Sequence, residues 1–187
     1  MRVISGSRKG HKLKSPKGLY TRPTSDKIKE SLFNILGNIA SESMVLDLFS
    51  GSGSIGIEFL SRGATSCYFI DNRLDSINII KENLLHTKLY EFAVVLKDDA
   101  LRALRDLKKN TIRFDYIFLD PPFKDRDLLF TVIEFISNYK ILFDTGLLIV
   151  EHDSSIEPND NLYNFIKVKS KNYGKETISF YKCSSRR

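Results

Sequence analysis

The sequence has no tryptophan, only two cysteines and no long apolar run. Cys67 and Cys183 lack the spacing of a metal site, and two thiols are too few for a disulfide scaffold. We therefore expect both cysteines to be reduced. The histidines (His11, His86 and His152) are scattered, so the sequence predicts no metal site. A membrane span needs about 20 consecutive apolar residues, and a secretory signal needs a shorter apolar segment near the amino end. Neither is found, which favours a cytoplasmic protein without membrane attachment.

Acidic residues are missing from positions 1–22. The basic residues of this segment are Arg2, Arg8, Lys9, Lys12, Lys14, Lys17 and Arg22. Their charge of +7 exceeds the +6 of the whole chain, so the remainder is close to neutral. A basic arm on a near-neutral body is typical of a protein that binds a nucleic-acid backbone, although a solubilising tail has the same composition. Gly6, Gly10 and Pro16 interrupt the arm and predict a small ordered hairpin or flap.

A chain of 187 residues is long enough for one domain with a full-sized core. We expect a basic extension over residues 1–23 and one body over residues 24–187. Within the body, apolar runs typical of buried strands occur at 44–49, 65–70, 92–96, 114–119 and 147–150. Apolar residues at helical spacing occur at 28–39, 55–60, 74–84, 101–107 and 128–136, with Thr24 as the expected cap of the first helix.

This alternation predicts a doubly wound α/β fold with a mostly parallel sheet. Two further strand candidates, at 163–168 and 177–181, flank Gly174 and suit an antiparallel pair. Ligands of such sheets bind beyond the carboxyl ends of the strands. The residues at those ends, around positions 47–53, 71, 99 and 120–123, are therefore the candidates for function.

Gly51, Gly53 and Gly56 form a G-x-G-x-x-G pattern between a strand and a helix, and Asp71 ends the next strand. Alone, this pattern fits a nicotinamide dinucleotide site, with the acid on the ribose. Asp47 argues against it, because a carboxylate just before the loop would repel a pyrophosphate. S-adenosylmethionine has no phosphate and carries a sulfonium and an ammonium group, so it suits both acids. We favour S-adenosylmethionine as the cofactor, with Asp71 on the ribose and Asp99 near the adenine amino group.

Asp120-Pro121-Pro122-Phe123 follows another apolar strand. The prolines fix φ and remove two amide donors, leaving carbonyl oxygens and the Asp120 carboxylate as acceptors. Such acceptors can hold the N–H groups of an exocyclic amine of a base and localise its lone pair for attack on a methyl group. Phe123 would stack on the base. A proline turn that merely ends a strand is the structural alternative.

The chain also resembles the bacterial 16S ribosomal RNA guanine-N2 methyltransferases, which belong to the S-adenosylmethionine-dependent enzymes with a Rossmann-like fold. The resemblance runs almost end to end, through segments 2–6, 10–13, 22–26, 29–34, 47–53, 60–64, 99–100 and 118–123. The Asp-Pro-Pro-Phe pattern is shared by many amino-methyltransferases, whereas the basic arm followed by Arg22-Pro23-Thr24 is more specific to this family. His11 and Arg73 depart from the family's usual residues, which are arginine and an acid.

The resemblance implies methylation of the N2 amino group of a guanine in 16S rRNA, within a partly or fully assembled small ribosomal subunit, by a monomer. Its catalytic residues would be Asp120, Pro121, Pro122 and Phe123. Its cofactor-binding residues would be Asp47, Phe49, Gly51, Gly53, Asp71, Asn72, Asp99 and Ala100. Its RNA-binding residues would be Arg2, Arg8, Lys9, His11, Lys12 and Arg22.

Four alternatives stay open from the residues alone. An adenine-N6 methyltransferase acting on DNA or RNA shares the Asp120 motif. A protein-glutamine methyltransferase also uses a proline-rich acceptor turn, but the basic arm argues against it. A non-enzymatic RNA-binding module and a dinucleotide reductase would leave Asp120 without a task. The short segment after Asp120 leaves no room for a separate recognition domain, so the arm and the loops must recognise the substrate.

Overall fold

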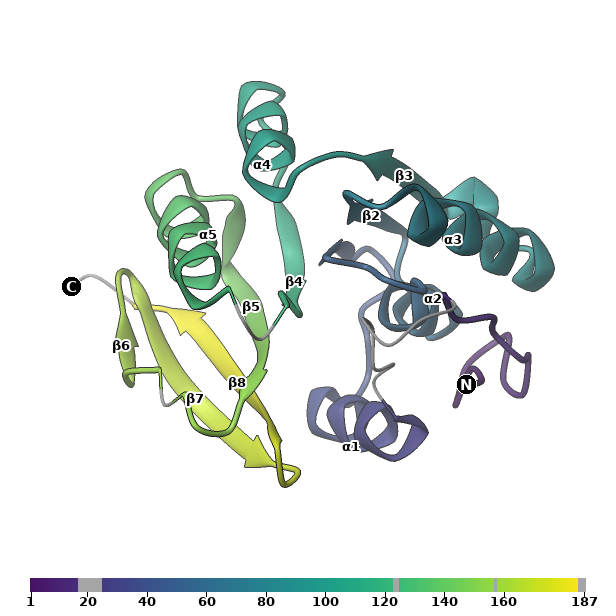
Figure 1. Cartoon of the computed structure of the whole chain (residues 1–187), viewed down its shortest axis with the longest axis horizontal. Coiled ribbons are helices and arrows are strands. Elements are labelled where there is room, and N and C mark those ends of the chain that lie inside the picture. Colours follow the sequence, from purple (N-terminus) through teal and green to yellow (C-terminus); the bar gives the residue numbers. More distant parts are fainter. Residues whose placement is uncertain (17–24, 123–124, 157, 185–187) are drawn as a thin grey trace. The chain divides into compact units, whose positions relative to one another are not determined.

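The computed structural model describes residues 1–16, 25–122, 125–156 and 158–184. The chain forms two compact units, Met1–Asp99 and Ala100–Arg187, which are described separately (Figure 1). The predicted boundary between residues 23 and 24 lies outside the described residues and stays a prediction. Within the described part, no helix is long and apolar enough to cross a membrane.

The first unit contains three parallel strands in the order β3-β2-β1. Its elements are α1 (Asp26–Leu36), β1 (Met44–Leu48), α2 (Ser54–Ser61), β2 (Ser66–Asp71), α3 (Leu74–Thr87), the 3-10 turn η1 (Tyr90–Phe92) and β3 (Ala93–Lys97). Val45, Leu46 and Leu48 are fully buried, as expected for a strand covered on both faces. The strand β3 differs from the prediction, because Val94 and Leu96 are 36% and 38% exposed.

The helix α1 begins after Ser25, whose Oγ accepts a 3.2 Å hydrogen bond from the Ile28 amide. Ser25 is therefore the N-cap, and the predicted cap at Thr24, which is outside the described residues, was wrong by one position. The hydroxyl of Ser25 satisfies one of the amides that have no partner inside the helix. Gly37 ends the helix with φ +71°, a conformation that glycine adopts without strain.

The second unit contains a mixed sheet with the order β4-β5-β8-β7-β6. Its elements are α4 (Ala100–Lys109), β4 (Phe114–Leu119), α5 (Arg126–Asn138), β5 (Leu142–Asp153), β6 (Asn161–Leu162), β7 (Phe165–Asn172) and β8 (Glu176–Cys183). The strands β4 and β5 are parallel, whereas β8, β7 and β6 continue antiparallel from β5. The predicted antiparallel pair is confirmed. The strand β5 is much longer than the predicted 147–150, and the two-residue β6 was not predicted.

Candidate functional site

The glycine loop joins β1 to α2 in a strained backbone conformation. Phe49, Gly51 and Gly53 have φ angles of 73°, 55° and 75°. A phenylalanine rarely adopts a positive φ, and such strain is frequent at functional sites. The Phe49 and Ser50 amides both donate 3.0 Å hydrogen bonds to the Ile70 carbonyl, which holds the loop against the end of β2.

Two glycines of the pattern, Gly53 and Gly56, also allow close packing. A Cβ on Gly56 would lie 2.3 Å from Phe69 Cε1 and 2.7 Å from Cys67 Sγ, so no other residue fits there without movement. A Cβ on Gly53 would lie 3.2 Å from Ile80 Cγ1. The glycines therefore bring α2 close to β2 and the loop close to α3, as in nucleotide-binding folds of this kind.

Asp47 is buried beneath the loop and is only 2% exposed. Its Oδ2 accepts a 3.0 Å hydrogen bond from the Gly56 amide, in the first turn of α2. Burial raises the pKa of this carboxyl to about 7, with a smaller increase from the charge of Asp71 and an opposing effect of the Gly56 hydrogen bond. Asp47 thus places a carboxylate at the positive end of α2, where a phosphate would otherwise bind.

Asp71 holds the other side of the loop. Its Oδ2 accepts a 2.9 Å hydrogen bond from the Gly51 amide, and its Oδ1 accepts one of the same length from the Arg73 amide. Its carbonyl accepts the Asp98 amide at 3.1 Å, so β2 also positions the segment that follows β3. Two amides that could bind an anion, those of Gly51 and Gly56, therefore already donate to carboxylates.

The remaining predicted cofactor residues differ in exposure. Asn72 and Asp99 are exposed and Phe49 is half-buried, so each can be reached by a ligand. Ala100 is only 6% exposed and belongs to the start of α4. The Asp99 amide donates to its neighbour Asp98 at 2.8 Å. Within the first unit, the structure brings together five of the predicted cofactor residues: Asp47, Phe49, Gly51, Gly53 and Asp71. Asp47 is too deeply buried to contact a ligand directly.

The predicted acceptor turn follows β4 in the second unit. Asp120 is half-buried, Pro121 is buried and Pro122 is exposed, whereas Phe123 lies outside the described residues. The Pro122 carbonyl accepts a 2.8 Å hydrogen bond from the Asp125 amide. The Pro122 carbonyl is therefore engaged within the turn, and the Asp120 carboxylate and the Pro121 carbonyl remain the acceptors that the sequence predicted.

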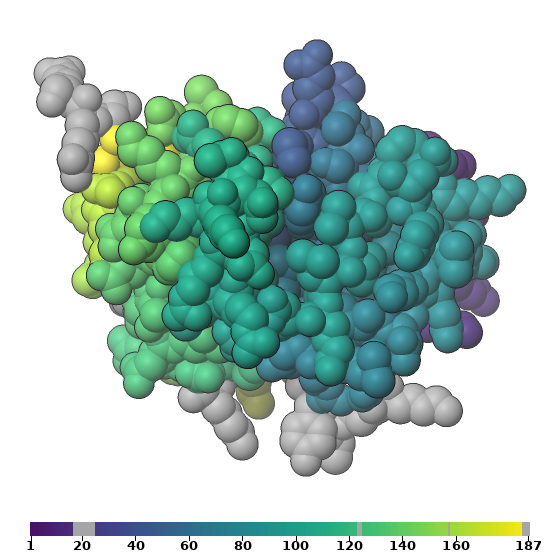
Figure 2. All heavy atoms as spheres, turned by 90° about the horizontal axis from the view of Figure 1, so that it is seen from above, coloured from purple at the N-terminus to yellow at the C-terminus, as the bar shows by residue number. Residues whose placement is uncertain are grey.

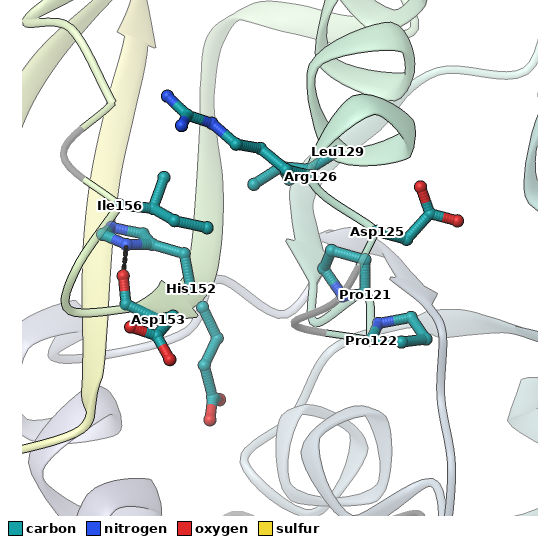
Figure 3. A pocket seen from close by; sticks show the side chains of 9 residues that line it. Pro121, Pro122, Asp125, Arg126, Leu129, His152, Asp153 and Ile156 are labelled. Atoms are coloured by element: carbon teal, nitrogen blue, oxygen red, sulfur yellow. Dashed lines mark hydrogen bonds between the residues drawn. The ribbon is translucent and has the colours of Figure 1, made fainter.

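A small pocket lies beside this turn (Figure 3). Its walls include Pro121, Arg126, His152 and Ile156, and Glu151 also lines it. The His152 ring bonds to Ser179 Oγ at 2.9 Å and to the Asp153 carbonyl at 3.0 Å, and burial lowers its pKa. Glu151 and His152 were not predicted as site residues, although both lie near the carboxyl end of β5, where such folds bind ligands.

The described part of the basic arm, residues 1–16, contains a hairpin, one of the two forms that the sequence predicted. The Val3 amide donates to the His11 carbonyl and the Gly10 amide donates to the Val3 carbonyl, both at 2.9 Å. Lys9 and Lys12 are exposed, whereas His11 is half-buried and its Nδ1 bonds to the Arg8 carbonyl at 2.9 Å. In Figure 2 the purple atoms of the hairpin are partly visible at the right edge, beside teal atoms. Arg22 lies outside the described residues.

Two other cations of the arm are paired. Arg2 Nε lies 3.7 Å from Asp26, and Lys14 Nζ lies 2.8 Å from Glu82. These pairs are solvent-exposed and contribute little to stability. They do reduce the charge that the arm presents, so the sequence-based count of seven cations overestimates its positive field.

Polar contacts to a buried acid hold the arm on the body, and they were not predicted from the sequence. Glu58, fully buried in α2, accepts the Ile4 and Ser5 amides at 2.7 and 2.9 Å. A Cβ on Gly6 would lie 1.8 Å from the Ser61 carbonyl oxygen, so the backbone of the arm touches the end of α2. An acid inside the apolar segment 54–61 was the available signal, because a buried acid requires partners.

The comparisons with known proteins agree with this fold. Over the whole chain, the structure superposes on one described as "Putative methyltransferase yhhF from Escherichia coli" with a TM-score of 0.85, at 28% identity and 99% coverage of that chain. A Haemophilus influenzae structure described as a "putative methylase" gives a TM-score of 0.78 at 31% identity, covering 98% of both chains. The chain therefore has the Rossmann-like methyltransferase fold.

The family model described as "Conserved hypothetical protein 95" matches residues 1–182, and the chain belongs to this family. A Bacillus subtilis relative, "Putative rRNA methyltransferase YlbH", is 41% identical over 182 residues, covering 97% of this chain and 98% of its own. "Ribosomal RNA small subunit methyltransferase D" of Escherichia coli is 35% identical over 154 residues, covering 82% of this chain and 75% of its own.

Proposed function

We propose that this protein transfers a methyl group from S-adenosylmethionine to the N2 amino group of a guanine in 16S ribosomal RNA. The observation that carries the cofactor assignment is the use of the Gly51 and Gly56 amides. Both donate to carboxylates, those of Asp71 and Asp47, so the loop offers negative charge where a dinucleotide would need donors for its phosphates. A cationic ligand fits this arrangement and a pyrophosphate does not.

The residues present have distinct tasks in the proposed reaction. When bound, S-adenosylmethionine would supply the methyl group and leave as S-adenosylhomocysteine, while the base nitrogen loses one proton. Asp71 would hold the ribose, and Asp99 would receive the adenine amino group. Asp120 and Pro121 would accept the N–H groups of the guanine and hold its nitrogen for attack, with Phe123 stacked on the base.

The substrate assignment rests on the arm and on the relatives. The exposed Lys9 and Lys12 suit contacts to RNA phosphates. Arg2, Arg8 and His11 are further candidates from the described part of the arm, and Arg22 is a candidate from the sequence alone. Relatives with substantial identity are named as rRNA methyltransferases, one of them for the small subunit. We propose that the protein acts in the cytoplasm as a monomer, on a partly or fully assembled small subunit.

The test uses two unmethylated substrates: 16S rRNA transcribed in vitro, and small subunits from a strain that lacks this protein. Each is incubated with the protein and S-adenosylmethionine carrying a labelled methyl group, then digested to nucleosides for mass spectrometry. We expect labelled N2-methylguanosine from at least one substrate. Labelled N6-methyladenosine would instead support the adenine alternative, and no label in either substrate would contradict the proposal.

A further inference from the structure

Asn83 connects the basic arm to the glycine loop. It lies on α3, is 1% exposed and makes three hydrogen bonds through its side chain. The Lys14 amide donates to Oδ1 at 2.8 Å, and Nδ2 donates to the Lys14 carbonyl at 3.0 Å. The same Nδ2 donates to the Ser52 carbonyl at 3.0 Å. One buried amide therefore holds the backbone of the arm and the backbone of the loop at once.

The chemistry of this side chain suits the task closely. An asparagine amide has two N–H donors and one acceptor oxygen, and all of them are used here. Aspartate would lack both donors and would place negative charge against two carbonyls. Leucine has a similar size, but it would leave three backbone groups without this partner, the buried Ser52 carbonyl and the part-buried amide and carbonyl of Lys14, and each loss carries a cost.

The position of Ser52 makes the contact relevant to the cofactor. Ser52 stands between Gly51 and Gly53, which both have positive φ, and it is 8% exposed. The hydrogen bond to its carbonyl fixes the peptide plane that joins Ser52 to Gly53. A second, weaker contact also joins the glycine loop to the arm, because Ser52 Oγ lies 3.8 Å from Met1 Sδ.

We propose that Asn83 is a positioning residue that couples the two ligand sites, so that cofactor and RNA each increase the affinity of the protein for the other. This inference rests on the proposed function, in which the loop binds S-adenosylmethionine and the arm binds RNA. A ligand that orders the loop also orders Lys14 through Asn83, and the second ligand then loses less conformational entropy on binding. Linkage requires the effect to be equal in both directions.

The variant that tests the coupling is Asn83→Leu. S-adenosylhomocysteine affinity is measured by calorimetry with and without 16S rRNA transcript, and RNA affinity is measured with and without S-adenosylhomocysteine. In the wild type, each ligand should raise the affinity for the other by at least about fivefold, the lower end of common allosteric couplings. The coupling ratio is the affinity for one ligand with the other present, divided by the affinity without it. In Asn83→Leu this ratio should fall to about one, and a loss of stability alone would not change it.

Two variants on the same helix serve as matched controls. Thr87→Val removes a fully buried hydroxyl that donates only to helix carbonyls, those of Asn83 and Leu84. Glu82→Gln removes the exposed ion pair with Lys14 and leaves the Asn83 contacts in place. Both should keep the wild-type coupling ratio. If Asn83→Leu also keeps it, or if the wild type binds both ligands without coupling, the inference is overturned.

A measurement on the wild type removes the dependence on a variant that folds. Saturating S-adenosylhomocysteine should slow hydrogen exchange at the Lys14 amide as well as at the loop amides, because Asn83 joins the two. Protection of the loop with unchanged exchange at Lys14 would overturn the coupling and leave the proposed function intact. A failure of the wild type to bind S-adenosylhomocysteine would instead contradict the proposed function.

Discussion

Glu58 Oε2 lies 3.9 Å from Lys29 Nζ, and both side chains are fully buried. Lys29 Nζ also donates to the Arg2 carbonyl at 2.6 Å, while Glu58 accepts the Arg62 Nε at 2.9 Å. Burial lowers the pKa of Lys29, and the charge of Glu58 opposes that effect. The pair lies between α1 and α2, and each partner also bonds to the backbone of the arm, so the ion pair anchors the hairpin.

Glu58→Leu should therefore destabilise the protein and release the arm. Removing one partner of a buried pair leaves an uncompensated charge and costs about 3–5 kcal/mol. Urea denaturation measures this loss, and limited trypsin digestion should cleave the variant faster after Arg8 and Lys9. Lys29→Met should cost less, because Glu58 keeps Arg62 and two backbone amides. Equal trypsin sensitivity of wild type and Glu58→Leu would contradict this anchoring role.

Asp47 should make stability depend on pH. Its folded pKa of about 7 lies above the ordinary value of 3.8 for an aspartic acid, so the folded state binds the proton more tightly. The resulting stabilisation is fully present below about pH 4 and is lost as the pH rises through about 7, a change on the order of 4 kcal/mol. Urea denaturation of wild type and Asp47→Asn across this range isolates the effect. The stability difference between the two proteins should change with pH, and a constant difference would contradict the assignment.

Gly56→Ala should destabilise the first unit even though alanine favours helices. The added Cβ would meet Phe69 and Cys67 at less than 3 Å in a packed core. Overpacking of this kind costs about 1–3 kcal/mol, measured by urea denaturation. Gly63→Ala is a useful comparison, because a Cβ there meets nothing within 4 Å and only the positive φ of 108° opposes it. An unchanged midpoint for Gly56→Ala would show that α2 can move away from β2.

The strands and helices were predictable because their apolar periodicity is local, and the residues at strand ends followed from the fold class. The coupling residues were not. Asn83 is one polar residue on an amphipathic helix, and nothing near it in sequence shows that it meets Lys14 and Ser52, 69 and 31 residues away. The short strand β6 was missed because two residues show no period. The depth of Asp47 depends on the packing of α2, which a motif does not encode.

Asp120→Ala should strongly slow methyl transfer while leaving cofactor affinity nearly unchanged. The carboxylate follows β4 and would act on the base, whereas the loop at Gly51 would hold the cofactor. Loss of one preorganised polar contact to the reacting group lowers turnover by about a hundredfold or more. Single-turnover transfer to 16S rRNA measures the rate, and calorimetry with S-adenosylhomocysteine serves as the control. Normal turnover in Asp120→Ala would remove this residue from the proposed chemistry.

RNA binding by the basic arm should weaken as the salt concentration rises, and the exposed lysines of the arm should contribute more to this dependence than the paired ones. Each phosphate contact contributes about 0.7 to the slope of log affinity against log salt for single strands, and about 0.9 for duplex DNA. Lys9 and Lys12 are exposed, so Lys9→Ala with Lys12→Ala should lower the slope by roughly 1.4 to 1.8.

Lys14→Ala should lower the slope of log affinity against log salt by less than half of the change in the Lys9/Lys12 double variant. The reason is that Lys14 already pairs with Glu82. Filter binding of 16S rRNA between low and moderate salt measures all three proteins, and S-adenosylhomocysteine affinity without RNA should be the same in each. An unchanged slope in the double variant would mean that the arm does not contact phosphates, since counterion release accompanies every such contact whatever the RNA sequence.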